Sequence, residues 1–263
     1  MKHLVKKYVK LAQLSEGAAE VLNNAPVDEV ELTKIADKRM DGYFAYAFTE
    51  DNKMVQTFKY ENEGKIYLIP EPDPIVIYFD TALHYHKTIK SRRDELFSKL
   101  SADYKDFHAV NGDFYWYYSN ASNFIIFLFL SLEAFINKSI PADFEYRRKI
   151  QNKRIELFDK LQIQRHIEFL EKIKKVIPQV PQFEGKNFVG EFTHKYDLIK
   201  DLKNFRDEIV HTKSFEGLDT NNFYEGLFVR SLNFDYDKVL LAARDYINYH
   251  QENLIEECQC GKD

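Results

Sequence analysis

The spacing of apolar side chains changes along the chain and separates an N-terminal region from the rest. Residues 3–23 repeat apolar side chains at helical spacing and predict an amphipathic helix that ends before Pro26. From residue 43 the spacing becomes strand-like, with short runs rich in aromatic and β-branched side chains between polar turns. Strands are predicted at 43–48, 54–60, 65–69 and 75–79, which together would form a small antiparallel sheet.

Helical spacing dominates the remainder of the chain. Asp80 or Thr81 is suited to cap a long helix that continues to about residue 102. Further helices are predicted at 113–139, 144–177, 195–212 and 235–255, with a loop at 179–193. The predicted fold class is therefore mainly α, with a helical bundle over 80–263. An N-terminal α+β region over 1–79 would contain the small antiparallel sheet.

One predicted helix is apolar on nearly all sides. The segment from Phe124 to Ile136 is interrupted only by Ser131 and Glu133. It is too short and too broken by charge for a membrane span, so we expect the central helix of the bundle. Glu133 and Asn137 lie four positions apart and share one face of this helix.

A buried carboxylate at Glu133 requires a cationic partner. Arg206 is the expected partner, with Lys203 as second choice. The substitution Glu133→Ala would then cost roughly 3 kcal/mol or more, because the remaining buried cation would be left unpaired.

The helix predicted at 195–212 ends in an arginine and a histidine, Arg206 and His211. At about 100° per residue they lie roughly 140° apart, so they flank a surface and do not share one stripe. An always-charged guanidinium and an imidazole that titrates near neutrality form a useful pair for phosphate chemistry. The alternative is a surface arginine and a helix-terminal histidine that interacts with the helix dipole.

Composition limits the classes of function. The chain has 263 residues, 44% of them hydrophobic, which is ample for a core. Its formal net charge of −5 gives no whole-protein attraction to nucleic acid. RNA would therefore have to meet local basic clusters, at 147–154 and 172–175, whose alternative interpretation is solvated helix faces. The first residues contain no apolar signal segment, which predicts a cytoplasmic protein.

Potential metal ligands are sparse. Cys258 and Cys260 lie one residue apart near the C-terminus with nothing nearby to complete four ligands, so we expect a frayed, reduced tail. His84 and His86 fall on different faces of a helix, which is poor geometry for a shared metal. No metal or cofactor site is predicted.

Two segments together resemble the HEPN superfamily (higher eukaryotes and prokaryotes nucleotide-binding domain). They are Leu-Glu-Ala-Phe-Ile-Asn at 132–137 and Phe-Arg-Asp-Glu-Ile-Val-His at 205–211. The resemblance covers roughly the last two thirds of the chain. Arg206 and His211 match the functional pair of the family, and Asp207 is a polar residue of the kind that often follows the arginine. One branch carries a modifiable tyrosine shortly after the histidine. This chain continues with Thr-Lys-Ser-Phe at 212–215 and departs from that branch.

The resemblance implies a homodimeric, HEPN-like helical bundle with metal-independent endoribonuclease activity. RNA supplies its own nucleophile, the 2′-hydroxyl, so the enzyme needs a group for proton transfer and a cation over the phosphorane oxygens. Arg206 and His211 are the expected catalytic residues. Asp207, Glu133 and Asn137 are expected to support or orient them. In bacteria, similar proteins often act as toxins or in phage defence.

A second interpretation is a non-catalytic helical module that binds RNA, a nucleotide or a protein partner. For the ribonuclease the expected partners are RNA and a second copy of the chain, and a regulatory protein or nucleic acid is left open. No membrane partner is expected. The aromatic run at 114–118 is expected to pack in the core and at the dimer interface.

Overall fold

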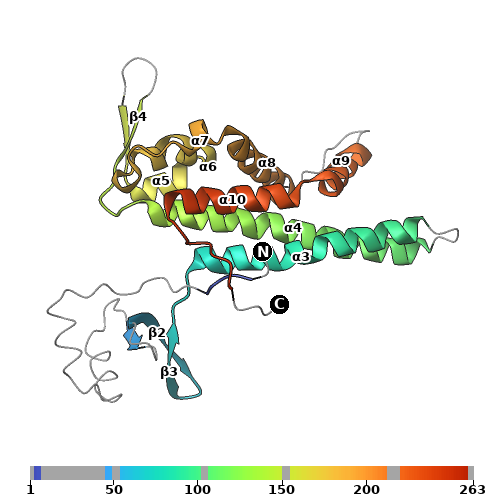
Figure 1. Cartoon of the computed structure of the whole chain (residues 1–263), viewed down its shortest axis with the longest axis horizontal. Coiled ribbons are helices and arrows are strands. Elements are labelled where there is room, and N and C mark those ends of the chain that lie inside the picture. The colour runs from blue at the N-terminus through green and yellow to red at the C-terminus, as the bar shows by residue number, and fades with distance from the viewer. Residues whose placement is uncertain are drawn as a thin grey trace. The chain divides into compact units, whose positions relative to one another are not determined.

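The computed structural model describes residues 3–6, 45–48, 54–101, 106–149, 155–211 and 220–259. The chain forms two compact units, one of residues 6–74 and the other of residues 1–5 and 75–263 (Figure 1). Helices dominate, and a small antiparallel sheet lies near the N-terminus of the chain. The predicted fold class, mainly α with a small antiparallel sheet, is confirmed.

The unit of residues 6–74 contains a three-stranded antiparallel sheet in the order β1-β2-β3. Its strands are β1 (Ala45–Phe48), β2 (Met54–Asn62) and β3 (Lys65–Pro70). Between β2 and β3, Glu63 and Gly64 have φ angles of 51° and 74°, as the central residues of a type I′ hairpin turn require. These strands confirm the prediction. The turn predicted at 50–53, and most of the helix predicted at 3–23, lie outside the described residues.

The fourth predicted strand, at 75–79, is wrong. These residues form the first turns of α3 (Pro74–Leu100), so the region boundary predicted after residue 79 falls inside a helix. Pro74 occupies the first helical position, where its missing N–H costs nothing. Ile75, Val76 and Phe79 are buried at helical spacing. A short apolar run fits a strand and a buried helix equally well on spacing alone.

A hairpin and several short helices replace the helix predicted at 144–177. β4 (Tyr146–Lys149) pairs with β5 (Ile155–Phe158). Asp159 and Gln162 then form a capping box that begins α5 (Lys160–His166). The chain continues through α6 (Phe169–Glu171), the π-helical turn η2 (Lys172–Val176), and the 3₁₀ turns η3 (Ile177–Gln179) and η4 (Pro181–Phe183).

Three long helices form the centre of the larger unit. They are α4 (Phe107–Ser139), α8 (Thr193–Val210) and α10 (Tyr236–His250). Each packs against the other two. In Figure 1, α3, α4 and α10 run alongside one another with α4 in the middle. The helices predicted at 80–102, 113–139, 195–212 and 235–255 are confirmed with shifted ends. The short α7 (Phe188–Glu191) and α9 (Thr220–Asn233) were not predicted.

The central position predicted for the apolar helix is confirmed in α4. Its fully buried side chains include Phe124, Ile125, Leu128, Leu132 and Phe135. Among the described residues, only α4 is long and apolar enough to cross a membrane by length and composition. Of its most apolar stretch 50% is buried inside the protein, and a core helix gives the same pattern.

The two ends of the larger unit pair with each other. Leu4 forms an antiparallel β-bridge with Glu257, and the Cys258 N–H donates to the His3 carbonyl at 2.9 Å. The helix predicted to begin at residue 3 is therefore wrong for residues 3–5. They are extended and lie alongside the C-terminal segment. The tail is held in place as far as Cys258, which corrects the expected fraying, and Cys260 lies outside the described residues.

Candidate functional site

The helix α8 places two charged side chains next to its buried face. That face consists of Tyr196, Ile199, Leu202 and Phe205. Arg206 and Asp207 follow directly, with 26% and 32% of their side chains exposed. Their charged groups are therefore within reach of solvent while their stems pack against the bundle.

Two contacts hold the Arg206 guanidinium. Its Cζ lies 4.1 Å from the centroid of the Phe129 ring on α4, which is a cation–π contact. One terminal nitrogen, Nη1, donates to Asp207 Oδ1 at 2.9 Å. Because a guanidinium has five N–H groups, further donors of Arg206 remain for an anion.

Asp207 lies between two cations of its own helix. Its second oxygen, Oδ2, accepts from Lys203 Nζ at 2.8 Å, so Lys203 is not paired with Glu133. Partial burial acts to raise the pKa of Asp207, but the hydrogen bonds from Lys203 and Arg206 outweigh it and hold that pKa below its usual range. Asp207 is therefore ionised at neutral pH and fixes the direction of the Arg206 side chain.

His211 lies immediately after the last residue of α8. Its backbone N–H donates to the Asp207 carbonyl at 2.9 Å and caps the helix. Its side chain is exposed, and in the part of the chain that the structure describes its ring has no hydrogen-bond partner. Arg206 and His211 thus belong to the same helix end. Residues 212–219, which follow, lie outside the described residues.

The predicted pairing of Glu133 with Arg206 is wrong. Arg206 forms its ion pair with Asp207, and the charge of Glu133 acts instead on Lys172 in η2. Asn137, one turn further along α4, accepts a hydrogen bond from Lys172 Nζ at 3.4 Å. Glu133 is half-buried, as predicted, but the structure places both it and Asn137 with a different cation.

Lys172 is a buried cation that sequence reasoning placed in a surface cluster. It is 2% exposed, and its Nζ donates to the Gln164 carbonyl at 3.0 Å. Burial lowers the pKa of Lys172 below its ordinary value, and the charge of Glu133 opposes part of this shift. Lys174 and Lys175 remain exposed. The contacts of Lys172 tie η2 to α4 and to α5, which is a structural role.

Arg230 fixes α9 against the C-terminal part of α8. It forms ion pairs with Glu208 and Asp201, and its Cζ lies 4.9 Å from the centroid of the Phe205 ring. Burial, and to a smaller degree the charge of Glu208, raises the pKa of Tyr118. The Phe228 ring of α9 lies 5.0 Å from the Tyr118 ring of α4, so α9 links the C-terminal part of α8 to the aromatic residues near the start of α4.

Within the described ranges, no three His, Cys, Asp or Glu side chains come close enough to hold a metal ion. His86 contacts Asp237 of α10, with 2.9 Å between Nε2 and Oδ1, whereas His84 is exposed. The contact between His86 and Asp237 could not be predicted from local spacing, because the two residues lie about 150 positions apart on different helices.

Comparisons with known proteins add no family to this arrangement. No protein-family model, no curated protein and no solved structure matches the chain. The side chains at the C-terminal end of α8 are therefore the observation from which a function is inferred.

Replacing Lys172 by methionine tests the buried cation. Because burial lowers the folded-state pKa, the unfolded chain binds more protons than the folded protein between that pKa and about 10.4, the ordinary lysine value. As pH rises through this window, the wild-type free energy of unfolding should increase relative to that of Lys172→Met. Urea denaturation between about pH 7 and about pH 10 measures the difference.

The matched control is Lys174→Met, which changes an exposed lysine two positions away. Its difference from wild type should stay constant over the same range. A Lys172→Met difference that is equally constant would contradict the account of a buried, charged Lys172.

Proposed function

We propose that the chain is a metal-independent endoribonuclease of the HEPN type, with RNA as substrate and Arg206 and His211 as catalytic residues. The supporting observation is the combination, at one end of α8, of a guanidinium with unused donors and an exposed imidazole. One supplies a cation for a phosphate, and the other supplies a group for proton transfer.

The proposed reaction is transfer of the RNA phosphate to its own 2′-hydroxyl. The 2′-oxygen attacks the phosphorus atom and loses its proton, the bond to the 5′-oxygen breaks, and that oxygen gains a proton. The products are a 2′,3′-cyclic phosphate and a 5′-hydroxyl. His211 would carry the proton in one of these transfers, and Arg206 would bind the phosphorane oxygens, where negative charge increases.

The geometry around Arg206 suits this role. Contact with Phe129 and the bond to Asp207 restrict the guanidinium before any substrate arrives, so less conformational freedom is lost on binding phosphate. Asp207 acts as a positioning residue. Glu133 and Asn137 are not proposed as part of the site, because the charge of Glu133 acts on Lys172 and Asn137 accepts a hydrogen bond from Lys172.

A two-fold dimer would complete the site by supplying a second imidazole. Tyr115 and Trp116 on α4 are 70% and 63% exposed, and large exposed aromatic side chains are typical of interfaces. They adjoin Tyr118, which packs against Phe228 of α9, and the ion pair of Arg230 with Glu208 holds α9 to the C-terminal part of α8. We therefore propose that this segment of α4 and the end of α8 meet their copies across the dimer axis, with His211 of one subunit near Arg206 of the other.

A non-catalytic module that binds RNA, a nucleotide or a protein through the same surface is the second candidate. The ion pair between Asp207 and Arg206 favours it, because Asp207 already neutralises much of the charge that a phosphate would meet. The proposed cytoplasmic location, and a role as a toxin or in phage defence, rest on the HEPN resemblance alone.

Cleavage of mixed RNA in the presence of EDTA tests the catalytic proposal. Wild-type protein should cleave equally well with and without EDTA. Arg206→Ala and His211→Ala should each lower the rate by at least about 100-fold, since each removes a phosphate contact or a proton carrier.

Arg165→Ala and His166→Ala are matched controls, because both side chains are exposed at the end of another helix, α5. Both should cleave like wild type. Equal cleavage by all variants, or loss of cleavage in EDTA, would refute the proposal. Salt-sensitive RNA binding without cleavage by wild type would favour the non-catalytic candidate.

The dimer is tested by light scattering at micromolar concentration. Wild type should show about twice the chain mass of 31.2 kDa. Trp116→Arg should yield monomer, because a charge would be buried at the contact. Leu161→Arg, at an exposed position on α5, should leave the dimer intact. A monomeric wild type would remove the composite site.

A further inference from the structure

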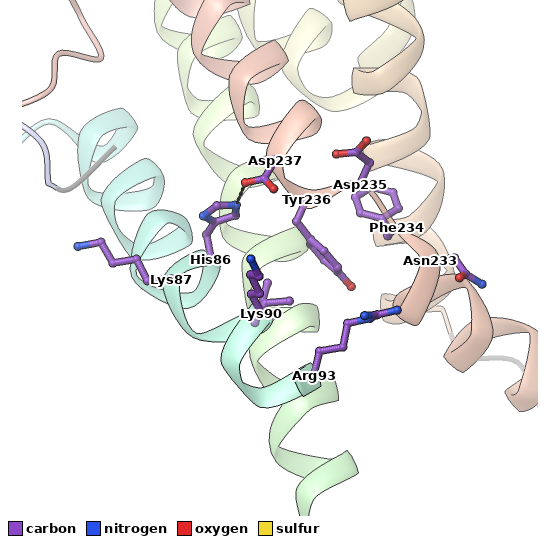
Figure 2. A pocket seen from close by; sticks show the side chains of 10 residues that line it. His86, Lys87, Lys90, Arg93, Asn233, Phe234, Asp235, Tyr236 and Asp237 are labelled. Carbon is purple, nitrogen blue, oxygen red and sulfur yellow. Dashed lines mark ion pairs between the residues drawn. The ribbon is translucent and has the colours of Figure 1, made fainter. Parts of the chain in front are cut away.

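A pocket of about 470 Å³ lies between α3 and the turn that joins α9 to α10 (Figure 2). His86, Lys90 and Arg93 line it from α3, and residues 233–237 line it from the other side. None of the α8 residues proposed for catalysis lines this pocket. It is therefore a separate candidate site.

Two cations of the pocket share one face of α3. Lys90 and Arg93 are three positions apart, and in Figure 2 both extend toward the start of α10 and the end of α9, whereas Lys87 extends away. The Arg93 Nε donates to the Leu232 carbonyl at 3.3 Å, which fixes the guanidinium and leaves its terminal nitrogens available. Lys90 has no ion-pair partner in the part of the chain that the structure describes.

The two carboxylates of the pocket are already engaged. Asp237 Oδ1 lies 2.9 Å from His86 Nε2. Asp235 caps α10 by accepting from the Lys238 N–H at 3.1 Å, and it pairs with Lys238 Nζ at 2.7 Å. Lys238 therefore balances Asp235. Burial lowers the pKa of His86, so His86 does not cancel the charge of Asp237 at neutral pH, but Lys90 and Arg93 still leave the pocket with a net positive charge. The first turn of α10 adds the positive end of its helix dipole to the same space.

We propose that this pocket binds a small phosphorylated organic molecule, whose phosphate is held between Lys90 and Arg93. A phosphate monoester carries a charge of about −1.5 to −2 at pH 7, which matches two cations better than a single carboxylate does. The volume falls within the range of about 300–1,000 Å³ that is typical of small-molecule sites. It exceeds what phosphate alone fills, so the ligand carries an organic group that occupies the remaining volume.

A nucleic-acid strand matches this pocket less well than a small molecule does. Strand-binding proteins use a longer basic groove with accessible aromatic rings, whereas Phe234 and Tyr236 are each only 9% exposed. The net charge of −5 also opposes the approach of a polyanion.

Calorimetric titration of the full-length protein with inorganic phosphate, AMP and adenosine tests the proposal. Inorganic phosphate, AMP or both should bind. If AMP binds, it should bind at least about 10-fold more tightly than adenosine. Lys90→Gln should weaken phosphate-probe binding by about 10-fold or more. Arg92→Gln is the control, because this substitution removes the same charge two positions away from Lys90, and Arg92 pairs with Glu95 at 3.1 Å. The dissociation constant of this variant should stay within about 2-fold of the wild-type value.

Three results would overturn the proposal. They are no heat with either phosphate probe up to about 10 mM, equal weakening by Lys90→Gln and Arg92→Gln, and measurable AMP binding that is no tighter than the binding of adenosine. Tighter binding of an RNA oligonucleotide than of AMP, lost in Lys90→Gln, would assign the pocket to RNA instead. Thermal melting of both variants checks their folding. None of these outcomes depends on whether the protein cleaves RNA.

Discussion

The apolar surface of α4 has to be covered, and α8 and α10 cover it together. Side chains such as Phe124, Leu128 and Phe135 are fully buried, and each contributes about 1.5–3 kcal/mol relative to an exposed position. This packing determines which residues of α8 face outward. Phe205 is buried against the bundle, so Arg206, the next residue, emerges at the edge of the helix contact and reaches the ring of Phe129.

Arg206 and Lys172 contact α4 on successive turns, and their different surroundings give the two cations different roles. Arg206 lies over Phe129 and keeps part of its guanidinium exposed. One turn further, Glu133 and Asn137 face the buried Lys172. A buried charge of this kind is costly unless it is paired and hydrogen-bonded. Lys172 therefore serves the packing of η2, whereas Arg206 remains available to a ligand.

Elements with a strong local signal were predicted from the sequence. The turn at residues 62–64, the strands on both sides of it and the long amphipathic helices all have a pattern that depends on neighbouring residues. The position of Arg206, Asp207 and His211 at one helix end was predicted in the same way, because their spacing lies within one helix. The segment at 144–177 failed because its scattered apolar residues fit several periods, and only tertiary contacts select the hairpin.

Contacts between elements that are far apart in the chain could not be predicted from the single sequence. The partner of Glu133 depends on a π-helical turn that delivers Lys172 to α4, and the pocket depends on α3 and α10 lying side by side. In both cases each side chain fits a surface position on its own helix. The packing of the unpredicted α9 is a third example, because Arg230 and its partners on α8 are about 20–30 positions apart.

We propose that Arg206 and His211 direct attack by the 2′-hydroxyl of RNA without a metal ion. The most direct measurement uses an RNA oligonucleotide of defined sequence in EDTA, and its copy with a single 2′-deoxynucleotide at the site of cleavage. The RNA should be cut to 2′,3′-cyclic phosphate and 5′-hydroxyl ends, and the substituted copy should stay intact at that position. Cleavage of the substituted copy at the same site, or products with 5′-phosphate ends, would contradict the proposal.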